Sequence, residues 1–125
     1  GGVFLNVTGD AKKLLDWYHD VLNLDVSSYG VNFLDPNSLT LITFDSKNEG
    51  QTVLNFSVDS LADYLEMLRS KGVKIVQEMQ VFDFGKFARI EDALGNQVEL
   101  SELVEERYRA MVEKEIADYR TQHKA

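Results

Sequence analysis

The sequence predicts an α+β fold made of two copies of a β-α-β-β-β unit, followed by one additional helix. First, apolar residues alternate with polar ones along several short segments, which is typical of half-buried strands. Second, two segments carry apolar residues at helical spacing. One runs from Asp10 to Asn23 and the other from Asp59 to Gly72, and each extends 13 positions from an acidic N-cap candidate to a residue that favours the end of a helix. Third, strand candidates follow both helices in the same order, which indicates an internal repeat.

The first unit is predicted at residues 3–46. Its helix spans residues 11–22, where the apolar side chains of Leu14, Tyr18 and Leu22 recur on one face. The expected strands are residues 4–8, 24–28, 30–34 and 39–44. The turn before the last strand contains Pro36 between Asp and Asn, a common turn composition.

The second unit is predicted at residues 51–102, with a helix that begins after Asp59 and ends at Gly72. The expected strands are residues 52–58, 73–77, 86–91 and 97–101. The last two strands are joined by residues 92–96, where Asp, Gly and Asn favour a tight turn. Together the two units make one domain over residues 1–125.

A C-terminal helix is predicted at residues 103–122. One apolar stripe runs along it, formed by Val104, Tyr108, Met111, Val112, Ile116 and Tyr119. We expect this stripe to pack on its own domain, and the alternative is a contact between two subunits of a homodimer.

Composition excludes several classes of function. The chain has 125 residues, a formal net charge of −8 and no cysteine. The negative charge argues against nucleic-acid binding, and the absence of cysteine excludes disulfides, thiolate catalysis and Cys-based zinc sites. No apolar run approaches the length of a membrane helix, and no signal peptide opens the sequence, so we expect a cytoplasmic protein without membrane contact.

Few residues are suited to metal binding or nucleophilic catalysis. The two histidines, His19 and His123, lie in a predicted helix and in the tail, and they are not placed to share a ligand cluster. No Ser-His-Asp set, phosphate-binding glycine loop or dinucleotide fingerprint is present.

Two sequence runs carry a family resemblance. The run DWYHDVLNL at residues 16–24 is similar to a D…FY…VLG-L pattern, and DALGNQVEL at residues 92–100 is similar to D-P-x-G-N-x-x-E-L. In order and spacing the chain resembles the vicinal oxygen chelate superfamily from residue 3 to about residue 102. This superfamily includes glyoxalase I, bleomycin-resistance proteins and extradiol dioxygenases.

The resemblance implies a curled, cup-shaped mixed sheet with helices outside and a binding site inside the cup. Metal-using relatives place one ligand on the first and one on the last strand of each module. Those positions fall on Gly2 or Val3, Thr40 or Ile42, Val53 and Glu99. Only Glu99 has a ligating side chain, so we expect no metal cofactor, the alternative being a divalent metal bound through Glu99.

Strand alternation then predicts the residues on the inner face of the cup. Val98 and Leu100 are predicted core residues, so Glu99 between them points to the opposite face. The predicted ligand-binding residues are Phe4, Asn6, Asn55, Ser57, Phe87, Arg89 and Glu99, with Thr8 on the same face. Aromatic walls with a few polar groups are typical of small-molecule pockets.

Two features of this face have more than one interpretation. Arg89 and Glu99 are expected to pair across their hairpin, either as a structural ion pair or as ligand-binding groups. The aromatic cluster of Phe82, Phe84 and Phe87 is expected to cover core or sheet edge, and the alternative is a loop that closes over a ligand.

Two functional hypotheses follow. The first is a metal-independent protein of the bleomycin-resistance kind, which sequesters or senses a small molecule that is cationic or aromatic. The second is a metal-dependent enzyme of the glyoxalase or dioxygenase kind. A third possibility is an interaction module that works through the C-terminal helix.

Overall fold

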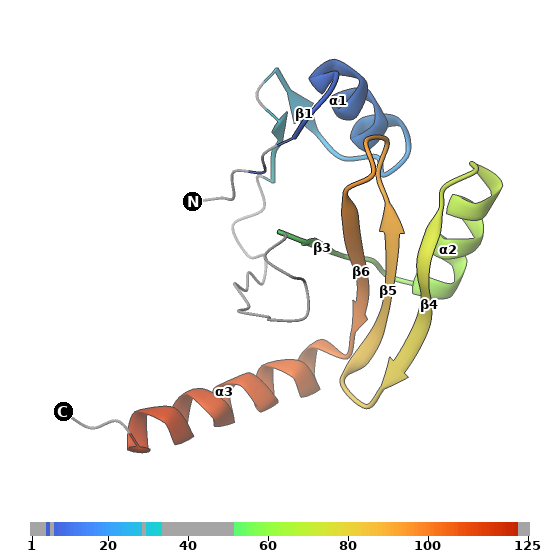
Figure 1. Ribbon diagram of the computed structural model, residues 1–125. Coiled ribbons are helices and arrows are strands. Elements are labelled where there is room, and N and C mark those ends of the chain that lie inside the picture. The colour runs from blue at the N-terminus through green and yellow to red at the C-terminus, as the bar shows by residue number, and fades with distance from the viewer. Residues whose placement is uncertain (1–4, 6, 29, 34–51, 123–125) are drawn as a thin grey trace.

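The computed structural model describes residues 5, 7–28, 30–33 and 52–122 (Figure 1). Its elements are α1 (Ala11–Asp20), β1 (Val26–Ser27), β2 (Gly30–Val31), β3 (Leu54–Ser57), α2 (Leu61–Ser70), β4 (Ile75–Phe82), β5 (Gly85–Glu91), β6 (Gln97–Leu103) and α3 (Glu105–Gln122). They form an α+β fold with a curled mixed sheet that does not close, which confirms the predicted fold class.

The main sheet has four strands in the order β3-β6-β5-β4. Strand β3 runs parallel to β6, and the other neighbouring pairs are antiparallel. Because of this register, Glu99 on β6 lies between Asn55 on β3 and Arg89 on β5.

The hydrophobic core lies between this sheet and the helices α1 and α2. Helix α2 contributes Leu61, Leu65 and Leu68, which are buried together with side chains from β5 and β6. Those strand residues are Ala88, Ile90, Val98 and Leu100, and α1 adds Tyr18 with Leu22 just after it. The predicted orientation of β6, with Val98 and Leu100 in the core, is therefore confirmed.

The second unit has the predicted order of elements, and its strands differ from the prediction at several of their ends: β3 is shorter, β4 begins two residues later and β6 ends two residues later. Strand β4 continues to Phe82, five residues beyond the predicted end. The N-cap of α2 is Ser60 and not Asp59, because the Ser60 hydroxyl accepts a hydrogen bond from the Asp63 N–H at 3.4 Å. Gly72, with φ of +76°, follows the helix as predicted.

The first unit agrees with the prediction at its helix. The Asp10 carboxylate accepts from the N–H groups of Lys12 and Lys13, and α1 ends two residues earlier than predicted. Asn23 has the left-handed backbone expected of it, with φ of +56°. Two of the expected strands appear as the short antiparallel pair β1 and β2.

The two remaining strands of the first unit are not seen in the described residues. Leu5, Val7 and Thr8 have no strand assignment, whereas Phe4 and Asn6 lie outside the described residues, as does the expected strand at 39–44. The boundaries of this unit therefore stay a prediction.

Helix α3 projects away from the sheet instead of packing on it (Figure 1). None of its residues is buried, and the side chains of Ile116 and Tyr119 are 46% and 63% exposed. Near its start, the Tyr108 ring lies 6.1 Å from the ring of Phe84. Among the described residues, the expected packing of the apolar stripe on its own domain is therefore seen only near the start of α3. No helix in the described part of the chain is long and apolar enough to cross a membrane.

Candidate functional site

Five predicted site residues lie together on the sheet face that points away from α2. We call this set the polar face: Asn55, Ser57, Phe87, Arg89 and Glu99. They alternate with the core residues of β3, β5 and β6, so the pleat of the sheet places them on one side. The other two predicted site residues, Phe4 and Asn6, lie outside the described residues.

A hydrogen-bond network joins the polar groups across three strands. Asn55 Nδ2 donates to Glu99 Oε1 at 2.7 Å, and Arg89 Nε donates to Glu99 Oε2 at 3.4 Å. The predicted pairing of Arg89 with Glu99 is therefore confirmed. Both carboxylate oxygens of Glu99 are engaged, one from each neighbouring strand, and this fixes the orientation of the carboxylate.

Two further residues belong to this network and were missed by the sequence reasoning. The buried hydroxyl of Ser101 donates to Asn55 Oδ1 at 2.9 Å, and Arg89 Nη1 donates to Gln97 Oε1 at 3.3 Å. Each lies two positions from Glu99 on β6, so the same alternation that selected Glu99 also selects them.

The central ion pair is half-buried, with side-chain exposure of 20% for Arg89 and 27% for Glu99. Partial burial strengthens the attraction between the charges relative to a fully solvated pair, because the local dielectric constant is lower than in water. At the same time both side chains remain in contact with solvent. A solute that reaches this face therefore meets a carboxylate, a guanidinium and an amide in a fixed arrangement.

Phe87 connects the polar face to an aromatic cluster at the end of the sheet. Its ring lies 6.0 Å from Phe82 and 5.8 Å from Phe84, and Phe84 in turn contacts Tyr108 at the start of α3. These contacts cover the β4–β5 turn and hold α3 to it. They favour the structural interpretation of the cluster over a loop that closes on a ligand.

The donors around Glu99 do not fit a divalent metal. Within the described ranges, no group of three or more His, Cys, Asp or Glu residues is close enough to hold an ion. The nearest charged neighbour of Glu99 is the Arg89 guanidinium, which repels a cation. Val53 has no ligating atom in its side chain, and the other two expected ligand positions, at Gly2 or Val3 and at Thr40 or Ile42, lie outside the described residues.

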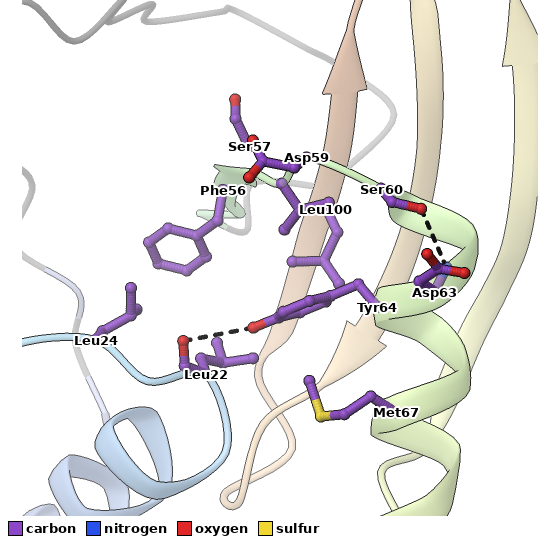
Figure 2. Close-up of a pocket in the computed structure, with 11 residues that line it drawn as sticks. Leu22, Leu24, Phe56, Ser57, Asp59, Ser60, Asp63, Tyr64, Met67 and Leu100 are labelled. Carbon is purple, nitrogen blue, oxygen red and sulfur yellow. Dashed lines mark hydrogen bonds between the residues drawn. The ribbon is translucent and has the colours of Figure 1, made fainter.

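A cavity of about 490 Å³ lies on the helical side of the sheet (Figure 2). It forms between the residues that follow α1, the first turns of α2 and the strands β3 and β6. Ser57 is the one member of the polar face that lines it. Sequence reasoning missed this cavity, because it depends on how the residues after α1 approach α2 and the sheet, and not on a local motif.

Comparison with known proteins matches this fold. The family model described as "Glyoxalase/Bleomycin resistance protein/Dioxygenase superfamily" matches residues 3–100. No curated protein matches the sequence.

Solved structures with the same fold have low sequence identity to the chain. TnmS3, an antibiotic binding protein from Streptomyces sp. CB03234, is 19% identical with a TM-score of 0.56, over 80% of this chain and 92% of that one. TioX from Micromonospora sp. ML1 is 13% identical with a TM-score of 0.54, over 82% and 94% of the two chains. At these identities the solved structures show only that the fold is shared. The family model matches most of the sequence, and the chain therefore belongs to the Glyoxalase/Bleomycin resistance protein/Dioxygenase superfamily.

Proposed function

We propose that this protein binds a small organic molecule on the polar face and does so without a metal, as a sequestering or sensing protein. The observation that carries the proposal is the network in which Asn55 and Arg89 orient the Glu99 carboxylate from two sides. A small number of fixed polar groups beside an aromatic side chain, here Phe87, is the usual composition of a ligand site.

The comparisons support the general class of function. TnmS3, which has the same fold, is described as an antibiotic binding protein. For the present chain, the charged pair suits a ligand that has both a hydrogen-bond donor for Glu99 and an acceptor for Arg89, next to an aromatic or apolar part. The net charge of −8 further favours neutral or cationic molecules.

Independence from metal is supported by the chemistry of the donors. A divalent cation needs several N, O or S ligands from the protein, and one carboxylate paired with a guanidinium does not supply them. Stoichiometric Zn, Ni, Mn or Fe in protein purified without chelator would instead support the second candidate, a glyoxalase- or dioxygenase-like enzyme.

A thermal-shift screen of metabolites and antibiotics tests the binding site. We expect a compound that stabilises the parent protein to lose most of its effect in Arg89→Gln and in Glu99→Gln. Lys86→Gln is the matched control, because it also removes a cation and an ion pair from β5 but on the helical face of the sheet. If the compound stabilises Arg89→Gln and Glu99→Gln as strongly as the parent, the polar face is not the binding site.

We further propose that the protein forms a homodimer through α3. The exposed apolar stripe supports this, because no residue of α3 is buried and Ile116 is 46% exposed. Light scattering should give a dimer for the parent and for Ala117→Glu, which lies on the opposite side of the helix, and a monomer for Ile116→Glu. A monomeric parent would contradict this assignment.

A further inference from the structure

We propose that the cavity between α2 and the residues that follow α1 is a second ligand site, which binds an organic cation with an aromatic or apolar body. It is lined by the core residue Leu100 and, of the polar face, by Ser57 alone. The proposal therefore adds a site and a ligand class to the proposed function and does not depend on it.

The inner part of the cavity is apolar and of suitable size. Leu22, Phe56, Met67 and Leu100 line it, and its volume of about 490 Å³ is within the range of small-molecule pockets. In Figure 2 the Phe56 side chain points toward the side of the cavity formed by Leu24, and the Tyr64 side chain reaches from α2 to Leu22. An apolar body placed here removes its own surface and that of these side chains from water.

The charged groups around the cavity are all of one sign. Asp59 and Asp63 line it at the start of α2, and neither forms an ion pair with any residue in the described ranges. No Lys or Arg is among the lining residues. Both acids are exposed, so a bound ammonium group can approach them from solvent while the rest of the ligand lies deeper.

Two aromatic rings add to the preference for a cation. Phe56 and Tyr64 both line the cavity, and ring faces attract cations. The Tyr64 hydroxyl donates to the Leu22 carbonyl oxygen at 3.4 Å, which holds the ring as a wall of the cavity (Figure 2). The helix dipole of α2 accounts for an acid in its first turn, Asp63, but not for the apolar cavity beside it.

Amide-resolved NMR of the full chain tests the site with phenethylammonium as the probe and phenethyl alcohol as its uncharged counterpart. We expect phenethylammonium to shift the amide signals of Leu22, Tyr64 and Met67 and to leave those of Arg89 and Glu99 in place. The alcohol should bind more weakly. The double variant Asp59→Asn, Asp63→Asn should weaken phenethylammonium binding by about two- to tenfold, as expected for exposed charge pairs.

Glu66→Gln is the matched control, because it removes an exposed acid from the same helix without lining the cavity. It should bind phenethylammonium as the parent does. The proposal is overturned if no shifts appear, if they appear on the polar face, if the alcohol binds equally well, or if Glu66→Gln weakens binding as much as the double variant. Shifts on the polar face would support binding there instead, whereas the other outcomes leave the polar face untouched, and the Arg89→Gln variant tests that face separately.

Discussion

Tyr18 should connect the first helix to the turn of the β5–β6 hairpin, and the variant Tyr18→Phe tests this connection. The Tyr18 hydroxyl donates to Asp92 Oδ2 at 2.9 Å across 74 positions of sequence, and both residues are buried. Asp92 Oδ1 in turn accepts from the N–H groups of Leu94 and Asn96, each at 2.9 Å. One carboxylate thus orders the turn and anchors α1 to it.

The expected loss of stability follows from these contacts. A hydrogen bond to a charged group contributes about 1.5–3 kcal/mol. Asn96 Nδ2 also donates to Asp92 Oδ2, at 2.9 Å, so the carboxylate keeps a partner after the substitution. The aromatic ring remains, and with it the contacts to Trp17 and Phe56. We therefore expect Tyr18→Phe to lower the free energy of unfolding by about 1.5 kcal/mol, the lower end of that range.

Urea unfolding followed by circular dichroism measures this loss. Tyr108→Phe is the control, because the Tyr108 hydroxyl forms no hydrogen bond in the residues that the structure describes, while its ring also packs on a neighbour. A loss below about 0.5 kcal/mol for Tyr18→Phe, the range of ordinary surface substitutions, would refute the reasoning. An equal loss in Tyr108→Phe would do the same.

Three further predictions concern stability. Burial raises the pKa of the Tyr18 phenol, and the neighbouring Asp92 carboxylate raises it further, so the folded state favours the neutral phenol. The free energy of unfolding should therefore fall above about pH 10, where the phenol of the unfolded chain ionises. In Tyr18→Phe it should fall less steeply with pH. Gly85→Ala should cost about 1–3 kcal/mol, because an added Cβ would lie 2.9 Å from the Glu102 carbonyl oxygen; a variant as stable as the parent would contradict this. Glu102→Ala should cost about 1 kcal/mol, because Glu102 Oε1 accepts from the first N–H of α2, that of Leu61, at 2.8 Å. Lys86→Gln removes the ion pair of Glu102 but keeps this cap, so it should cost less in the same urea assay.

The second unit could be predicted from sequence because its strands alternate and its turns contain the expected residues. Val98 and Leu100 in the core fixed the side of Glu99, and the register of β5 and β6 then brought Arg89 beside it. The left-handed backbone of Asn23 and of Gly72 was also foreseeable, since these residue types tolerate positive φ.

Other features depended on tertiary contacts that sequence does not display. Asp59 and Ser60 are both good N-cap residues, and only the hydrogen bond from the Asp63 N–H to the Ser60 hydroxyl identifies Ser60 as the cap. The stripe on α3 has helical spacing, but its spacing does not reveal that the helix leaves the sheet. The cavity requires the residues that follow α1 to lie opposite α2 and Phe56, and neither segment encodes that approach locally.

Calorimetric titration of the strongest hit from the thermal-shift screen into the chelator-treated parent protein tests the proposed function most directly. Since Glu99 is held by Asn55 and Arg89, we expect the same affinity before and after chelation, and little binding to Arg89→Gln. Binding that disappears on chelation and returns with Zn, Ni, Mn or Fe would contradict metal-independent recognition by the polar face.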